Sequence, residues 1–163
     1  MKLFFIGIKG SGMTSLASVV KDLGYDVSGS DVEEQFFTEF KLINKGIEIV
    51  SFDASNITGD IDAIILGNAF NEEHPQVLKA KELGIKIYKY FDYLDEVAKK
   101  YYSVAIAGTN GKTTTTGLMC ELMKHEPISY LIGDGTGVGN KDAKKFIYEA
   151  CEYKYTFLNY SPN

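Results

Sequence analysis

Short apolar runs alternate along nearly the whole chain with segments whose apolar residues recur at the spacing of an α-helix. This alternation limits the folds that the chain can adopt. Parallel strands need a long return connection, usually a helix, so the pattern is typical of a parallel sheet with crossover helices. The expected strands are residues 2–8, 25–29, 47–50, 63–66, 85–88, 103–107, 129–132 and 145–150. The expected helices are residues 13–23, 36–44, 77–83, 92–99 and 113–124. The sequence therefore predicts an α/β fold.

The strand–helix pattern restarts near residues 99–102, and we expect a domain boundary close to residue 100. Residues 1–100 would form a first domain, and residues 101–163 the start of a second. The glycine-rich stretch 133–140 is expected to be a loop. A length of 163 residues suits one small domain plus part of another.

A glycine turn follows the first expected strand, with glycines at Gly7, Gly10 and Gly12. Where a strand becomes a helix, the first helical N–H groups lack internal partners, and the helix dipole favours an anion. Glycine lets a diphosphate approach the backbone closely. Asp31 lies about 20 residues further on, where a carboxylate accepts from a ribose hydroxyl in dinucleotide-binding folds. The turn is thus a candidate nucleotide site.

This turn matches the dinucleotide fingerprint imperfectly. Read from Gly10, the third glycine is replaced by Ser15, and read from Gly7, the second is replaced by Lys9. From the residues alone three interpretations stay open: a nucleotide other than a nicotinamide cofactor, NAD(P), or a tight turn without a ligand.

The strongest motif is the string AGTNGKTT at residues 107–114, which follows an apolar strand and opens a helix. Amides of residues 108–112 can cradle phosphate oxygens, the Lys112 ammonium can neutralise the β- and γ-phosphates, and the Thr113 hydroxyl can ligate Mg²⁺. Ile106 stands where the ordinary phosphate loop has its first glycine. This departure favours an ATPase with a shorter loop over a GTPase, and the competing interpretation is a glycine–threonine turn without a ligand.

Glu149 ends the apolar strand 145–150 and is a candidate Mg²⁺ ligand, because hard cations take oxygen ligands. It would share a sheet edge with the phosphate loop if the two strands are neighbours. The competing interpretation is a solvated acid at a strand end, and Glu152 is a weaker candidate. His74 and His125 are expected to be surface residues without a catalytic role.

Composition excludes several classes of protein. The net charge of −5 and the absence of a basic patch argue against nucleic-acid binding. No run approaches the roughly 18–20 apolar residues of a membrane span, and residues 3–8 are too short for a signal peptide core. Cys120 and Cys151 have no motif spacing, so we expect core residues in a reduced, cytoplasmic setting.

Together these segments resemble the Mur ligases, the ATP-dependent amide-forming enzymes of peptidoglycan synthesis. The resemblance covers essentially the whole chain, through five motifs in the same order. They are FFIGIKGSGMTSLA (4–17), YDVSGSD (25–31), AIAGTNGKTTTTGL (105–118), LIGDGTGVGN (131–140) and YEACEYKYTFLNYSP (148–162).

The resemblance implies a Rossmann-like parallel sheet that holds UDP-N-acetylmuramate, followed by a phosphate-loop ATPase domain. The residues implied for the UDP-sugar are Gly10, Ser11, Gly12, Met13 and Thr14 at the diphosphate, with Asp31 and Asn68 at the uridine. Those implied for ATP are Gly108, Thr109, Asn110, Gly111, Lys112, Thr113 and Thr114, with Lys112 catalytic and Thr113 and Glu149 on Mg²⁺.

The resemblance also implies a reaction that serves cell-wall biogenesis, cell shape and cell division in the cytoplasm. ATP would phosphorylate the lactyl carboxylate of UDP-N-acetylmuramate, and the amine of L-alanine would attack the acyl phosphate. The family branch that reattaches a recycled tripeptide is the nearest rival, on the segment Gly67-Asn68-Ala69. Two functions of a different class also stay open: a UDP-sugar or ATP-binding module without catalysis, and a nicotinamide dehydrogenase.

Two features depart from the family pattern. Asn110 stands where the family usually has histidine. The sequence also ends at Asn163, before the rest of the family's central domain and its third domain. From these departures we expect a chain that binds ligands without turnover, and a segment from residue 103 that is either mobile or paired in a homodimer.

Overall fold

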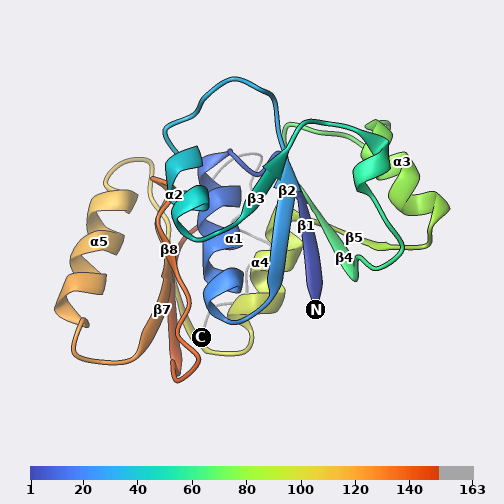
Figure 1. Cartoon of the computed structure of the whole chain (residues 1–163). Coiled ribbons are helices and arrows are strands. Elements are labelled where there is room, and N and C mark those ends of the chain that lie inside the picture. The colour runs from blue at the N-terminus through green and yellow to red at the C-terminus, as the bar shows by residue number, and fades with distance from the viewer. Residues whose placement is uncertain (151–163) are drawn as a thin grey trace.

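The computed structural model describes residues 1–150, and two sheets organise them (Figure 1). The first sheet has five parallel strands in the order β3-β2-β1-β4-β5. Its strands are β1 (Lys2–Ile6), β2 (Asp26–Ser30), β3 (Glu48–Val50), β4 (Ala63–Leu66) and β5 (Lys86–Lys89). This is the Rossmann-type order, and it confirms the predicted α/β class.

Helices cover both faces of the first sheet. They are α1 (Ser11–Asp22), α2 (Glu39–Asn44), the 3₁₀ turn η1 (Ala54–Asn56), α3 (Pro75–Glu82) and α4 (Tyr90–Ala98). Leu3 and Phe5 pack in the cluster with α1 and α4, whereas Phe4 and Ile6 pack in the cluster with α3. Side chains alternate between the faces of a strand, so a continuous apolar run serves a sheet that is buried on both faces.

The second sheet has the order β6-β9-β7-β8. Its elements are β6 (Tyr102–Ile106), α5 (Lys112–Leu122), β7 (Ile128–Leu131), β8 (Gly137–Val138) and β9 (Lys145–Glu149). β6, β9 and β7 are parallel, as the alternation predicted. β8 is antiparallel to β7, so the expected loop 133–140 is in part a hairpin strand. Two glycines make the difference: Gly135 turns the chain with φ of 88°, and Gly137 lies in β8.

Most element ends lie one to three residues from the predicted ones, and two of these differences concern the glycine turn and α2. β1 ends at Ile6 because Gly7 turns the chain with φ of 82°. The helix expected over residues 36–44 begins only at Glu39. Near the predicted start of this helix, Phe37 and Phe40 do not mark a buried face, since they are 72% and 69% exposed.

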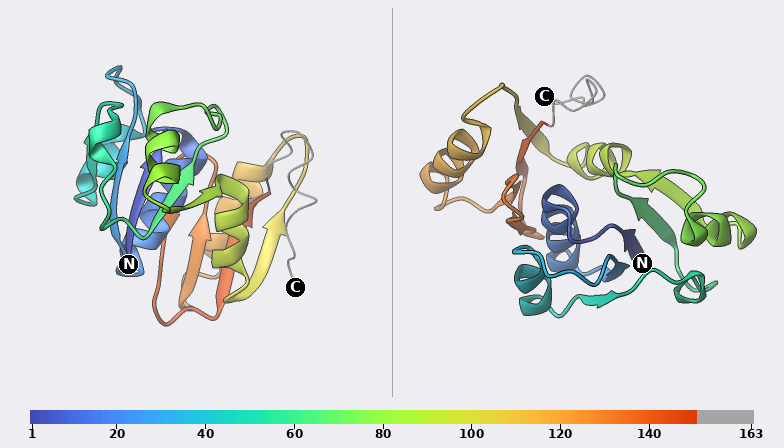
Figure 2. Two further views of the ribbon diagram at one scale, coloured as in Figure 1. Left: turned by 90° about the vertical axis from the view of Figure 1, so that its right-hand side faces the viewer. Right: turned by 90° about the horizontal axis from the view of Figure 1, so that it is seen from above.

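The second sheet rests on α1 through the β7–β8 hairpin, which we call the glycine hairpin (residues 131–139). Figure 2 shows α1 lying between the two sheets. The Ser15 hydroxyl donates to the carbonyl of Ile132 at 2.7 Å, and the Gly139 amide donates to Asp22 Oδ2 at 3.1 Å. A Cβ added at Gly137 would lie 1.9 Å from the carbonyl oxygen of Ser15. Only glycine permits this close approach of hairpin and helix backbones.

Candidate functional site

The chain reverses direction across the first sheet between β1 and β4, which are neighbours at its centre. β1 leads to β2 on one side, and β4 leads to β5 on the other. In open α/β sheets, ligands bind outside the carboxyl ends of the strands at such a switch point. Here β1 ends in the glycine turn, and β4 ends in Gly67 and Asn68.

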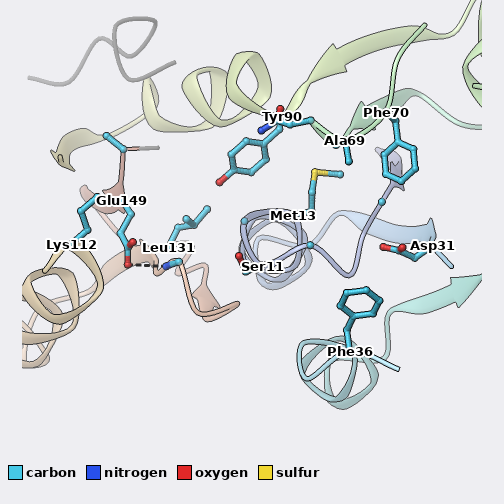
Figure 3. Close-up of a pocket in the computed structure, with 17 residues that line it drawn as sticks. Ser11, Met13, Asp31, Phe36, Ala69, Phe70, Tyr90, Lys112, Leu131 and Glu149 are labelled. Atoms are coloured by element: carbon cyan, nitrogen blue, oxygen red, sulfur yellow. Dashed lines mark hydrogen bonds between the residues drawn. The ribbon is translucent and has the colours of Figure 1, made fainter. Parts of the chain in front are cut away.

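A cavity of about 820 Å³ opens at this point and extends to the second sheet (Figure 3). The first part of the chain lines it with Gly7, Gly10, Ser11, Gly12, Met13, Asp31, Phe36, Gly67, Asn68, Ala69, Phe70 and Tyr90. The second part lines it with Lys112, Leu131, Gly133, Glu149 and Ala150. Both candidate sites therefore face one cavity, although about 100 residues separate Ser11 from Lys112 along the chain.

The glycine turn uses several of its own amides. The Gly7 and Ile8 amides donate to the carbonyl of Ser30 at 2.9 and 3.2 Å, and the Gly10 amide donates to the carbonyl of Gly7 at 3.3 Å. The first N–H groups of a helix have no acceptor within the helix. The donors available to an anion are therefore the amides of residues 11–13, at the start of α1, rather than the Gly10 amide.

Two of the residues expected at the UDP-sugar have structural partners. Asp31 lines the cavity, yet its Oδ2 accepts from the Lys9 amide at 2.7 Å and its Oδ1 from the Val32 amide at 2.8 Å. Thr14 is fully buried and its hydroxyl donates to the carbonyl of Ile8 at 2.8 Å. Thr14 thus stabilises the turn and does not line the cavity, whereas Asp31 both stabilises the turn and lines the cavity.

Lys9 is a structural residue of the site that the sequence did not single out. Its side chain is only 4% exposed, and its ammonium donates to the carbonyls of Val32 and Glu34, both at 2.9 Å. It also lies 3.1 Å from Glu39 Oε2. A buried ammonium is tolerated only when it is paired and hydrogen-bonded, so Lys9 fixes the segment that carries Phe36 into the cavity wall. The signal in the sequence was that Lys9 stands where the dinucleotide fingerprint, read from Gly7, has its second glycine.

The phosphate loop connects β6 to α5 in the predicted strand–loop–helix arrangement. Gly108 and Gly111 have φ of 151° and 78°, which glycine adopts readily. The Lys112 ammonium donates to the carbonyl of Gly108, which closes the loop on itself. Lys112 lines the cavity, whereas the other six residues expected at ATP lie in the loop and the first turn of α5, where they are exposed or half-buried.

Glu149 lies on the same sheet edge as the phosphate loop. β6 and β9 are neighbours, with Ile106 paired to Glu149 in register, so the condition for this placement holds. The Thr113 hydroxyl lies 3.3 Å from Glu149 Oε2, and the Gly133 amide donates to Glu149 Oε1 at 2.8 Å. The dashed line at Glu149 in Figure 3 marks the second bond.

The oxygens of Thr113 and Glu149 fit a Mg²⁺ ion. Octahedral Mg²⁺ with bonds of about 2.1 Å places adjacent ligand oxygens about 3 Å apart, close to the 3.3 Å between these two atoms. Within residues 1–150 there is no cluster of three or more His, Cys, Asp or Glu side chains suited to a metal. Mg²⁺ does not need such a cluster, since it usually takes one or two carboxylates and completes its shell with water and phosphate.

Comparison with known proteins decides the family. A model of the "Mur ligase family, catalytic domain" matches residues 2–102, which is more than half of the chain. The chain belongs to the Mur ligase family.

Solved Mur ligases share the fold over almost all of the chain. The UDP-N-acetylmuramate–alanine ligase MurC of Thermotoga maritima is 30% identical, with a TM-score of 0.87, over 100% of this chain and 40% of that one. The UDP-N-acetylmuramate:L-alanyl-γ-D-glutamyl-meso-diaminopimelate ligase of Neisseria meningitides is 27% identical, with a TM-score of 0.80, over 93% and 53%. This Mur ligase chain thus spans about half, or less, of the length of these relatives.

Three side chains away from the cavity in this Mur ligase, those of His74, Cys120 and His125, belong to residue types that often carry chemistry. Burial lowers the pKa of His74, which is half-buried rather than fully exposed and packs on Phe52 and Phe70 at ring distances of 4.9 and 5.3 Å. His125 is exposed, as predicted. Burial raises the pKa of the Cys120 thiol to about 11, which leaves it protonated and unreactive at neutral pH.

Several other expectations from the sequence have separate outcomes. Cys151, expected in the core, and Glu152, the weaker metal candidate, lie outside the described residues. None of the helices within residues 1–150 has the length and apolar character needed to cross a bilayer. The domain boundary near residue 100 and the pairing of the later segment in a homodimer stay predictions.

Proposed function

We propose that this Mur ligase joins L-alanine to UDP-N-acetylmuramate, with ATP as the energy source and ADP as a product. The shared cavity carries the proposal, because the start of α1 and the Lys112–Glu149 side of the second sheet both line it. An ATP-dependent amide ligase must bring the carboxylate of its nucleotide-sugar substrate to the γ-phosphate of ATP, and one shared cavity meets this requirement.

Within the proposal, the two parts of the chain have separate tasks. Residues 1–100 hold the nucleotide sugar, with the diphosphate on the amides of residues 11–13 and the uridine near Asp31 and Asn68. Residues from 101 onward hold ATP, with the phosphates on the loop before α5. The helix dipoles of α1 and α5 favour both anions.

The proposed chemistry begins at a carboxylate, which is a poor electrophile at neutral pH. A lactyl carboxylate oxygen attacks the γ-phosphorus of ATP. The bond between this phosphorus and the oxygen that bridges the β- and γ-phosphates breaks, and ADP leaves. The amine of L-alanine then attacks the acyl carbon, phosphate leaves, and the nitrogen loses a proton. Lys112 stabilises the charge that develops on the transferred phosphoryl group. Thr113 and Glu149 would hold Mg²⁺, which supplies further charge neutralisation.

A tripeptide acceptor is the second candidate. The Neisseria relative, whose name specifies a peptide acceptor, is 27% identical over 93% of this chain, nearly as similar as the alanine ligase. ADP formation by the protein with UDP-N-acetylmuramate and either L-alanine or the tripeptide distinguishes the two. Dependence on L-alanine alone supports the first proposal, and dependence on the tripeptide supports the second. If the protein binds its ligands but forms no ADP with either acceptor, the result supports a non-catalytic binding module.

A thermal-shift panel tests the ligand assignment. A ligand that binds the folded state at about 100 times its Kd stabilises it by about 2.7 kcal/mol. We expect shifts with UDP-N-acetylmuramate and with MgATP and none with NADH. Lys112→Ala should lose the MgATP shift and keep the UDP-N-acetylmuramate shift, because the proposal assigns the ATP phosphates to Lys112 and the UDP diphosphate to the amides of residues 11–13. A shift with NADH alone would contradict the proposal and favour a dehydrogenase.

A further inference from the structure

One peptide group links the first helix to the candidate metal ligand. Ile132 and Gly133 share a peptide bond whose carbonyl accepts from the Ser15 hydroxyl at 2.7 Å and whose amide donates to Glu149 Oε1 at 2.8 Å. In a trans peptide the C=O and N–H point in opposite directions. The group therefore reaches α1 on one side and β9 on the other.

The two oxygens of Glu149 are thereby used differently. Oε1 is held by the Gly133 amide, and Oε2 lies 3.3 Å from the Thr113 hydroxyl at the start of α5. A carboxylate that is held through one oxygen presents the other in a fixed direction. The accepted bond at the carbonyl also polarises the N–H of the same peptide, which strengthens its donation to a charged acceptor.

A side chain at position 133 would conflict with Glu149 rather than with the backbone conformation, since the φ of Gly133 is not in the left-handed region. A Cβ added there would lie 2.6 Å from Glu149 Oε2 and 3.2 Å from its carboxyl carbon. Any side chain at 133 would therefore displace the carboxylate itself. Gly133 therefore affects the Glu149 carboxylate in two ways: its amide donates to the carboxylate, and its lack of a side chain leaves room for it.

Ser15 provides the other half of the arrangement. It is fully buried on α1, and its hydroxyl is also 2.9 Å from the carbonyl of Ser11, so the one proton is shared with the shorter bond to Ile132. This residue stands where the dinucleotide fingerprint has its third glycine. Its hydroxyl is accounted for by a partner 117 positions away.

We propose that Gly133 and Ser15 are positioning residues that orient the Glu149 carboxylate for the cation that accompanies ATP. The inference rests on the proposed function, because it takes the Thr113–Glu149 pair to be the Mg²⁺ site. Ser15 holds the Ile132–Gly133 peptide against α1, and the peptide amide holds Glu149. Outer partners of this kind contribute about ten- to a hundred-fold to metal affinity in protein sites.

The test is calorimetric titration of the protein with ATP, with and without Mg²⁺, so that the readout is binding rather than turnover. Gly133→Ala should reduce the Mg²⁺-dependent gain in ATP affinity about ten-fold or more, and Ser15→Ala should reduce it less. Neither should change the affinity for ATP without metal, which depends on the phosphate loop. Gly117→Ala is the matched control, since a Cβ there meets no atom within 4 Å, and it should behave as wild type.

A cycle with Glu149→Gln separates positioning from a general packing defect. If Gly133 and Ser15 act through Glu149, their substitutions cause no further loss in the Glu149→Gln background. Equal losses in both backgrounds, or an unchanged Mg²⁺ effect in Gly133→Ala, would overturn the inference. Wild-type protein that shows no Mg²⁺-dependent ATP binding would instead contradict the proposed function, so the two failures are distinguishable.

Discussion

His74 combines two roles at the residue scale, and the role of capping a helix needs its neutral form. Its Nδ1 accepts from the Gln76 amide at 3.3 Å and so caps α3, and its ring packs on Phe52 and Phe70. Protonation removes the acceptor and places a positive charge at a helix N-terminus, where the dipole is unfavourable. The cap of α3 thus depends on a group that titrates in a physiologically relevant range.

The pKa of His74 predicts a pH dependence. Burial lowers this pKa below its ordinary value of 6.5, so the unfolded chain takes up the proton first as the pH falls. The contribution of His74 to stability is complete above pH 6.5 and is lost as the pH falls through the folded-state pKa. His74→Asn keeps a good N-cap but does not titrate. Urea unfolding at about pH 7.5 and about pH 5 should show wild type losing up to about 1 kcal/mol relative to the variant, the size of one N-cap. Parallel losses in both proteins would contradict this.

The sequence located the site residues better than it described their roles. The glycine spacing and the Gly-Lys-Thr triplet placed Ser11, Gly12, Met13 and Lys112 on the cavity wall. The sequence did not predict that the Lys9 amide donates to Asp31 or that Thr14 is buried. A side chain's partner depends on the three-dimensional path of the turn, whereas the pattern records only spacing.

The glycine hairpin is the decisive unit at the scale of elements. The contacts of its backbone with α1 set how the second sheet lies against the first. The strand alternation predicted every parallel strand but not this hairpin. A two-residue strand such as β8 has no periodicity to detect, and its pairing with β7 is enforced by packing on a helix more than 100 residues earlier.

Gly137→Ala tests the importance of this contact. The added Cβ would lie 1.9 Å from the Ser15 carbonyl oxygen, and backbone on both sides limits relaxation. We expect the free energy of unfolding to fall by about 1–3 kcal/mol, the usual cost of overpacking. Gly117→Ala should instead be neutral or stabilise α5 by up to about 1 kcal/mol. Urea unfolding measures both, and equal stability of the two variants would show that the hairpin does not press on α1.

At the scale of the whole molecule, the two sheets enclose one cavity that neither forms alone. Lys41 on α2 reinforces the arrangement by donating to the Asp134 carbonyl at 2.9 Å and to the Thr136 hydroxyl at 2.8 Å. Such partly exposed contacts contribute little to stability, so the shared apolar core around α1 carries most of the association. The sequence predicted two phosphate-binding junctions, but not that they would face each other, because their relative position depends on contacts between distant segments.

Two helix N-termini, those of α1 and α5, are proposed to present anion-binding groups to this one cavity. A crystal structure of the protein with UDP-N-acetylmuramate and MgATP would locate both ligands at once. We expect the diphosphate at the amides of residues 11–13 and the β- and γ-phosphates at Lys112. Electron density that places either set of phosphates outside this cavity, at occupancy sufficient to identify the ligand, would contradict the proposal.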